Sequence, residues 1–459
     1  MTEKKFINKD YASKLIDCLG EEFVVINNPD YVHPQFEICP MAEKIYSVPG
    51  IIPAFVMDMD GTTTTTEVLC IHSLEYMLRR ISGKISINEW IGLDKVSDYP
   101  HIIGNSTTKH VEYLIGKYQT MIVQEELIKS FIHSSLWTLV LGHDEKRKDE
   151  VRNNILNLGF GDILNDSKFT ELLSSTDKKE ISLSIVNDLY NTYKSCFKEY
   201  SFDGLVRIGI DVYYQRYHEI LERIKNGEGN KVAEELFTNS DKHLIEPMPG
   251  VLVFLSLVKG WINEAEADLF VPKILEDYKE KTGSEYLPQE NKIQVIENLK
   301  KLARLYKSRP AKTALVTSSI FYEADIVMKE LMKMIRMQIE KVSLLPEEKR
   351  TFLKNKFSDY NNVYDAFITA SDSSEIRLKP HRDLYSIALY KLHIAKNNFN
   401  KIAGFEDSES GTIAIRAAGI GLCVALPFAQ TKHHDLKSAS YVCHGGLPEV
   451  ILKHKLFIK

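Results

Sequence analysis

The feature that most restricts the fold is a short apolar run that ends in two aspartates and a glycine. The run covers residues 51–56 and is followed by Asp58, Asp60 and Gly61. Its apolar character and length predict a buried β-strand, and Gly61 predicts a turn directly after it. Carboxylates at the end of a buried strand are poorly solvated, so they persist where a cation or a reacting group compensates their charge. The pattern therefore indicates either a polar turn or a functional site.

An EF-hand calcium loop is excluded by the spacing of the residues that follow. Such a loop needs glycine at its sixth position and glutamate at its twelfth. Counted from Asp58, Gly61 is fourth and Leu69 is twelfth. The choice between a turn and a functional site therefore depends on later parts of the chain.

Composition restricts the class of protein. The 459 residues, 44% hydrophobic and 26% charged, are enough for two or three domains with a large core. A net charge of -5 without a basic run argues against nucleic acid or an anionic membrane surface as a partner. The six cysteines are widely spaced, with neither a C-x-x-C pair nor zinc-ligand spacing, so we expect reduced thiols. Because no signal-like or membrane-spanning apolar run is present, we expect a cytoplasmic protein.

A long all-helical segment follows the first strand. From Glu67 to about residue 243, apolar residues recur at helical spacing and strand alternation is absent. Helices are expected from residue 67 and at 111–118, 123–141, 181–197 and 210–224, with a loop at 226–230. This length is typical of a full domain. Residues 1–50, with a helical pattern at 11–19, could pack on the core or form an oligomer contact.

From Pro247 onward, short apolar runs alternate with helical patterns. Extended segments are expected at 313–316, 366–369, 402–405 and 422–425, and helices at 251–258, 321–335, 384–392 and 412–418. The segment 264–308, rich in Glu and Lys, is expected to form a solvated helical hairpin. Strands that alternate with helices predict a parallel sheet with helices on both faces and with ligands at the carboxyl ends of its strands.

Polar residues stand where the second predicted strand ends. Thr317 and Ser318 come directly before a predicted helix. Hydroxyls and backbone N–H groups at a helix N-terminus suit an anion, although a simple helix cap has the same pattern.

Two later strand ends carry charged groups. Lys379 precedes Pro380, which fits the first turn of the next predicted helix, and Glu406 with Asp407 follows the fourth strand. Together with the two aspartates after the first strand, these groups suit a hard divalent cation such as Mg2+ and a phosphoryl group.

This set of groups indicates phosphoryl transfer through a covalent intermediate. We assign Asp58 as the nucleophile that forms an aspartyl phosphate. Asp60, two residues later, would protonate the leaving oxygen and then deprotonate water. Lys379 and Mg2+ would offset the repulsion between a carboxylate and an anionic phosphate.

These segments resemble the haloacid dehalogenase superfamily, and in particular its beta-phosphoglucomutase-like branch. The matching segments are DMDGT at 58–62, PMPGV at 247–251, ALVTSS at 314–319, residues 365–385 and GFEDSESG at 404–411. The resemblance implies an α/β fold with a Rossmann-like parallel sheet core and an all-helical cap domain inserted after the first core strand. We expect an N-terminal extension at 1–50, a core at 51–66 and 244–459 with a helical insertion at 264–310, and a cap at 67–243. The extension, the insertion and the length of the cap depart from the family pattern.

The resemblance also implies roles for individual residues. The catalytic residues would be Asp58, Asp60 and Lys379; the phosphate would bind Thr317 and the Ser318 amide; Mg2+ would bind Asp58, the Asp60 carbonyl, Glu406 and Asp407. The cap segment at 104–110 resembles a loop that selects the substrate, which makes Ser106 and Thr107 candidates for substrate contact.

The sequence therefore predicts a Mg2+-dependent phosphatase for a small phosphorylated metabolite. A phosphomutase acting on a sugar phosphate is the alternative, because it shares every core residue. Asp60 argues against the dehalogenase and phosphonate-cleaving branches, which lack the second aspartate. A third hypothesis is a non-catalytic scaffold that uses the cap as its interaction surface. The sequence identifies neither the substrate nor the oligomeric state, and the extension or the cap could form an oligomer contact.

Overall fold

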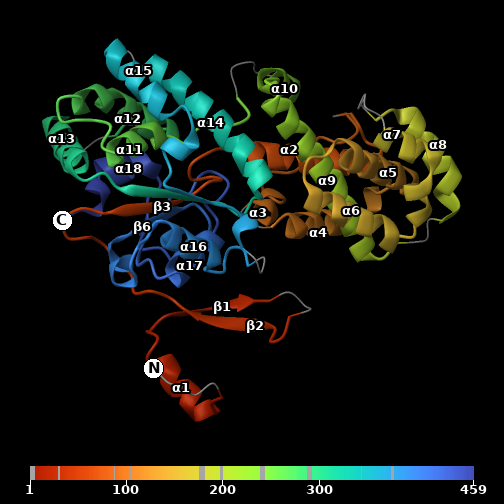
Figure 1. The fold of residues 1–459 in the computed structure, drawn as a ribbon, viewed down its shortest axis with the longest axis horizontal. Helices are drawn as coiled ribbons and strands as arrows, with labels where there is room; N and C mark the ends of the chain where they lie inside the picture. Colours follow the sequence, from red (N-terminus) through yellow and green to blue (C-terminus); the bar gives the residue numbers. More distant parts are fainter. Residues whose placement is uncertain are drawn as a thin grey trace. The chain divides into compact units, whose positions relative to one another are not determined.

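The computed structural model describes residues 6–28, 32–86, 88–103, 106–174, 181–196, 200–237, 243–286, 292–342, 344–373 and 377–459 (Figure 1). The chain divides into two compact units. The first, here called the sheet unit, comprises Met1–Thr65 and Ile245–Lys459, and the second, the helical unit, comprises Thr66–Leu244.

The sheet unit is built on six parallel strands in the order β5-β4-β3-β6-β7-β8. The strands are β3 (Ala54–Asp58), β4 (Lys312–Val316), β5 (Ala366–Ile368), β6 (Ala403–Glu406), β7 (Leu422–Ala425) and β8 (Tyr441–Val442). The parallel sheet and the helical insertion after its first strand confirm the predicted fold class. Strand β8 was not expected from the sequence, since two residues give no detectable alternation.

Helices cover both faces of this sheet, because alternate residues of β3 point to opposite sides. Ala54 and Val56 belong to a buried apolar cluster with residues of α16 (Asp383–Lys391) and α17 (Glu409–Ala417). On the other face, the Phe55 ring lies 5.1 Å from Phe254 of α11 (Val251–Val258). Figure 1 shows α16 and α17 on one side of β3 and β6, with α11 on the other.

The insertion at 264–310 forms the expected pair of packed helices, but one side of each helix is part of the core, so the expectation of a solvated hairpin was wrong in its exposure. It forms α12 (Ala267–Thr282) and α13 (Lys292–Ser308). Phe270, Ile274 and Tyr306 are fully buried, and the Tyr306 ring lies 6.2 Å from Phe55. Apolar residues at helical spacing occupy one side of each helix, while the Lys and Glu residues that dominate the composition occupy the other side.

Other helices differ from the expectations in their bounds. Besides α14 (Phe321–Lys341), the sheet unit has α15 (Glu347–Lys356) and α18 (Gly446–Leu452), which no sequence pattern indicated clearly. Helix α16 begins at Asp383, so Pro380 precedes the helix and does not lie in its first turn, contrary to the expectation. The Lys379–Pro380 peptide bond is cis.

The N-terminal residues belong to the sheet unit. They form α1 (Lys9–Asp17), where a helix was expected, and an antiparallel hairpin of β1 (Phe23–Asn27) and β2 (Phe36–Pro40). The fully buried Arg416 side chain of α17 donates to the Ala42 carbonyl (2.6 Å) and pairs with Glu22. A buried guanidinium therefore attaches this segment to the core.

The helical unit contains no strand among its described residues. Its α-helices are α2 (Glu67–Ser82), α3 (Tyr99–Ile102), α4 (Thr107–Tyr118), α5 (Gln124–Leu141), α6 (Glu145–Asn157), α7 (Ser167–Ser174), α8 (Leu183–Tyr193), α9 (Phe202–Lys225) and α10 (Gly229–Leu236). The expected loop at 226–230 ends earlier, because α10 begins at Gly229. Helix α9 packs against α2, α4 and α5. Among the helices of the described segments, none has the length and apolar character needed to cross a membrane.

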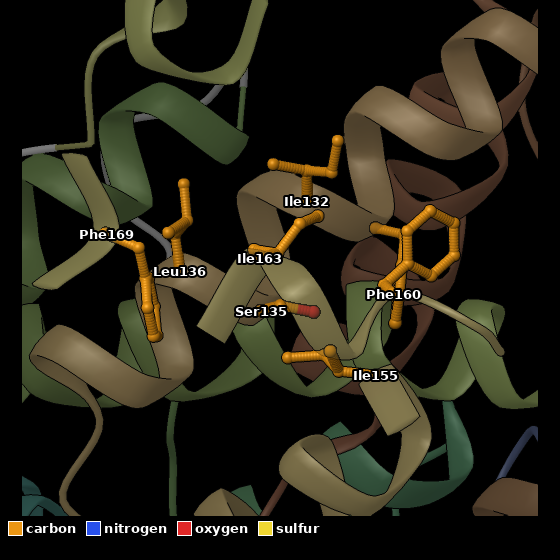
Figure 2. A pocket seen from close by; sticks show the side chains of 8 residues that line it. Ile132, Ser135, Leu136, Ile155, Phe160, Ile163 and Phe169 are labelled. Carbon is orange, nitrogen blue, oxygen red and sulfur yellow. The ribbon is translucent and has the colours of Figure 1, made fainter. Parts of the chain in front are cut away.

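The helical unit has its own apolar core. Figure 2 shows a small hollow between α5, α6 and α7 that is lined mainly by aliphatic and phenylalanine side chains. Ser135 is the polar residue of this lining, and its buried hydroxyl has no hydrogen-bond partner within the described residues. The apolar lining and the lack of a second polar group are typical of imperfect packing.

Candidate active site

The carboxyl end of β3 brings Asp58 next to Lys379, 321 residues further along the chain. Asp58 is 4% exposed, and Val316 at the end of β4 is its partner in the sheet register. The Lys379 ammonium group donates to Asp58 and, at 2.7 Å, to Glu406 at the end of β6. The Lys379 side chain is 7% exposed, so one buried cation bridges two buried carboxylates.

Burial and charge act differently on the two carboxylates. Burial raises the pKa of Asp58 well above its ordinary value, and the neighbouring Glu406 charge adds to this effect, whereas Lys379 opposes it. For Glu406, burial would also raise the pKa, but the Lys379 charge and hydrogen bonds from Lys379 and Ser408 lower it. The lysine and the Ser408 donors thus keep Glu406 ionised, and a further cation beside Asp58 would favour its ionised form.

Glu406 is held by a dense set of hydrogen bonds. Its Oε2 accepts from the Asp407 and Ser408 amides (both 2.9 Å) and from the Ser408 hydroxyl (2.8 Å). Its Oε1 accepts from Lys379 and, at 3.3 Å, from the Tyr385 hydroxyl. The sequence assigned no role to Tyr385, since nothing in the local pattern separates it from a core aromatic residue.

Two glycines leave space for these carboxylates. A Cβ atom on Gly411, in the first turn of α17, would lie 1.7 Å from Glu406 Oε1. A Cβ atom on Gly61 would lie 2.7 Å from Asp407 Oδ2, and Gly61 also has a positive φ of 82°. A side chain at either position would displace a carboxylate. Both positions therefore need glycine, because a carboxylate lies directly against the backbone there.

The loop after β4 contacts the second aspartate. The Thr317 hydroxyl donates to Asp60 Oδ2 at 3.0 Å and accepts from the Ser319 amide at 3.0 Å. The Ser318 amide and hydroxyl have no hydrogen-bond partner in the described part of the chain, and Ser318 is exposed. Helix α14 begins three residues later, at Phe321, and its first amide donates to the Ser371 hydroxyl at 3.1 Å.

Three carboxylates form a group suited to a metal ion. One oxygen from each of Asp58, Glu406 and Asp407 lies within 4.8 Å of the others, and all three residues are buried. Hard carboxylate oxygens are the ligands that Mg2+ prefers in proteins. This set of carboxylate oxygens therefore fits Mg2+.

The structure thus brings together the predicted core residues at one edge of the sheet: Asp58, Asp60, Thr317, Ser318, Lys379, Glu406 and Asp407. The two cap candidates belong to the helical unit. The Ser106 hydroxyl caps α4 by accepting from the Lys109 amide, and the Tyr214 hydroxyl donates to Thr107 at 3.3 Å. Residues 104 and 105 of the predicted loop lie outside the described residues, and a substrate-binding role for Ser106 and Thr107 stays a prediction.

Comparison with known proteins adds matches among solved structures. CbbY from Rhodobacter sphaeroides in complex with phosphate is 11% identical, covering 87% of this chain and 96% of that one, with a TM-score of 0.38. A putative beta-phosphoglucomutase from Thermotoga maritima is 16% identical, and the match covers 87% of this chain and 96% of that one with a TM-score of 0.31. A putative phosphoglycolate phosphatase from Lactobacillus delbrueckii is 13% identical, and the match covers 88% of this chain and 99% of that one with a TM-score of 0.32. No protein-family model and no curated protein sequence matches the chain.

The chain resembles the haloacid dehalogenase superfamily. This resemblance consists of the order of the motifs and of the parallel sheet that gathers their polar residues around Asp58.

Proposed function

We propose that this protein is a Mg2+-dependent phosphatase that hydrolyses a small phosphorylated metabolite through an aspartyl phosphate on Asp58. The observation that carries the proposal is the bridge from Lys379 to Asp58 and Glu406 beside the carboxylate of Asp407. A nucleophile, a fixed cation and oxygen ligands for a metal ion converge at the carboxyl end of a central strand, where ligands bind in parallel sheets.

Asp58 would act as the nucleophile. One of its carboxylate oxygens forms a bond to phosphorus while the bond from phosphorus to the leaving oxygen breaks. Lys379 holds Asp58 through its hydrogen bond and places a positive charge where two anions must approach each other. Glu406 keeps Lys379 in position, and its oxygens already accept five hydrogen bonds.

Asp60 would transfer the protons. It donates a proton to the leaving oxygen in the first step and takes one from the attacking water in the second, which releases phosphate and regenerates Asp58. The Thr317 hydroxyl, 3.0 Å from Asp60 Oδ2, orients that carboxyl group. The Ser318 amide and hydroxyl would bind oxygens of the phosphoryl group.

The metal ion would be held by Asp58, the Asp60 carbonyl and Asp407, with Glu406 in the same carboxylate group. When bound, Mg2+ supplies positive charge that stabilises the oxygens of the phosphoryl group. Direct coordination by Glu406 would require the loss of some of its hydrogen bonds, so we propose that Glu406 acts mainly through Lys379.

The proposal is tested by phosphate release from a panel of phosphorylated metabolites with Mg2+, measured for the wild type and for Asp58→Asn. The substitution keeps the shape of the side chain and removes the nucleophile, so we expect release to fall by at least about 10³-fold. Release should also be lost after chelation of Mg2+. Asp144→Asn, at the N-terminus of α6 in the helical unit, is the matched control and should keep wild-type activity.

The same assay separates the alternatives. Conversion of a sugar phosphate into its isomer without phosphate release would favour the phosphomutase. Neither reaction on any compound, together with no Mg2+ binding by calorimetry, would favour the non-catalytic scaffold.

A further inference from the structure

A second group of metal-ligating side chains lies near the C-terminus, apart from the Asp58 carboxylates. Cys443 follows β8 directly, Glu449 lies in α18, and His454 follows α18 by two residues. One ligand atom from each of these three residues lies within 4.8 Å of the others. We call them the Cys443 cluster. It combines sulfur, oxygen and nitrogen, whereas the Asp58 group offers carboxylate oxygens only.

The Cys443 thiol is buried without a hydrogen-bond partner. The residue is 0% exposed, and across the described ranges its thiol makes no hydrogen bond. Cys423 is equally buried, but its thiol donates to the Thr412 carbonyl at 3.7 Å. The Cys423 thiol therefore has a hydrogen-bond acceptor, whereas the Cys443 thiol lies near a carboxylate oxygen of Glu449 and an imidazole nitrogen of His454.

The other two ligands are held in place. Glu449 Oε2 accepts from the Gly445 amide at 2.7 Å, which orients the carboxylate. The His454 ring stacks on Phe457 with centroids 4.9 Å apart and lies 5.0 Å from the Tyr441 ring. His454 Nε2 is 3.7 Å from Glu449 Oε1. Two ligands of a tetrahedral zinc ion are separated by roughly 3.3 Å, so this pair needs only a small movement.

We propose that Cys443, Glu449 and His454 bind a divalent cation of the zinc class. Thiolate and imidazole select Zn2+ or Co2+ over Mg2+ and Ca2+, and three protein ligands leave a fourth position for water or another donor. On binding, the thiol proton passes to solvent, because the thiolate is the ligand. Lys453, 3.2 Å from Glu449 Oε1 and 61% exposed in its side chain, can move into solvent as the metal replaces it.

The site would join the end of β8 to α18 and to the segment that follows this helix. Strand β8 has two residues and one neighbour in the sheet, β7, and α18 has seven residues. A metal ion bound by Cys443 after β8, Glu449 in α18 and His454 beyond this helix would cross-link this edge of the sheet unit. Because binding to the folded state stabilises it, the cation should raise the midpoint of thermal unfolding.

The test uses Co2+ as a spectroscopic probe in the full-length protein, with excess Mg2+ present to occupy the Asp58 carboxylates. We expect a thiolate-to-cobalt charge-transfer band that saturates at one equivalent and is displaced by Zn2+. The band should be absent in Cys443→Ser. For His454→Gln, the Co2+ concentration that gives half of the maximal band should rise by at least about tenfold. Cys423→Ser, His433→Gln and Asp58→Asn are matched controls and should keep the band.

The proposal is overturned if the wild type shows no charge-transfer band, or if the band survives in Cys443→Ser or is unchanged in His454→Gln. Should Cys443→Ser fail to fold, His454→Gln decides, since its side chain is 17% exposed and the substitution leaves the thiol in place. Because the band requires a thiolate near the metal, a failure here is distinguishable from a failure of the proposed phosphatase activity.

Discussion

Lys379 shows how much the candidate site depends on a single side chain. Its ammonium group is the shared partner of Asp58 and Glu406, and all three side chains are at most 7% exposed. A buried ion pair adds little to stability compared with an apolar replacement of all its members, but removal of one partner leaves the other charge uncompensated. Lys379 therefore affects both the chemistry and the stability of this edge of the sheet.

We expect Lys379→Met to lower the free energy of unfolding by about 3–5 kcal/mol and to abolish phosphate release, because it leaves two buried carboxylates without a cation. The matched control is Lys329→Met in α14. Lys329 pairs with Asp325 at 2.7 Å, but its side chain is 63% exposed, so a change below about 0.5 kcal/mol is expected. Urea denaturation measures both values. Equal effects of the two substitutions would contradict the bridging role of Lys379.

At the scale of elements, the N-terminus of α17 approaches β6 closely. The Glu406 carboxylate occupies the space that a side chain at Gly411 would need, and it accepts hydrogen bonds from the backbone that opens this helix. The helix and the strand end thus position the carboxylate together. The glycine is needed for its small size, since its φ is not positive.

Gly411→Ala should therefore reduce phosphate release by at least about tenfold and lower the free energy of unfolding by about 1–3 kcal/mol, because Glu406 must move away from Lys379. Gly116→Ala is the control. A Cβ atom on Gly116, inside α4, would meet Phe202 at an ordinary 3.8 Å, so this change should stabilise the protein by about 0.5–1 kcal/mol. Steady-state kinetics and urea denaturation of both variants check the result. Wild-type activity in Gly411→Ala would refute the close-approach argument.

The insertion at 264–310 gives a second prediction for an element. Phe270 of α12 is 0% exposed, whereas Ile293 of α13 is 70% exposed. If α12 is a layer of the core, Phe270→Ala should cost about 3–5 kcal/mol of stability, while Ile293→Ala should change it by less than about 0.5 kcal/mol. Chemical denaturation distinguishes this outcome from that of a solvated hairpin, for which both changes would be small.

At the scale of the whole molecule, the helical unit carries two partly buried histidines whose lowered pKa values make its stability depend on pH. Burial lowers the pKa of His72 to about 4, with Arg216 and Arg79 adding to the effect. Burial also lowers the pKa of His133 to about 4, and Arg80 adds to it. The unfolded chain takes up protons on these residues below about pH 6.5, but the folded chain does so only near pH 4.

The stability contributed by the neutral histidines is therefore complete above about pH 6.5 and is lost as the pH falls toward 4. Between pH 6.5 and pH 5 the loss is about 1.5 kcal/mol for each histidine. His72→Gln combined with His133→Gln should flatten this part of the curve, as measured by urea denaturation at a series of pH values. His143→Gln, with a side chain that is 55% exposed, should keep the wild-type slope. An unchanged slope in the double variant would show that other groups dominate.

Much of the architecture followed from local patterns in the sequence. The run before Asp58 became β3, and the extended segment at 422–425 became β7 with the same bounds. Apolar runs bounded by glycine and polar residues are short-range signals, since they depend only on neighbouring positions. The carboxylates and Thr317 could be placed at strand ends for the same reason, whereas Lys379 lies in the segment between β5 and α16.

Only the tertiary structure decided which of these groups meet. The order of the strands puts β3 between β4 and β6, and this order makes Lys379 the common partner of Asp58 and Glu406. It also places Tyr385 on Glu406, turns a charge-rich insertion into a core layer and assembles the Cys443 cluster from residues without zinc-ligand spacing. Sequence periodicity reports which side of an element is apolar, whereas contacts between distant residues depend on how the elements pack. The packing therefore determined the contacts of the site, and the sequence determined its residues.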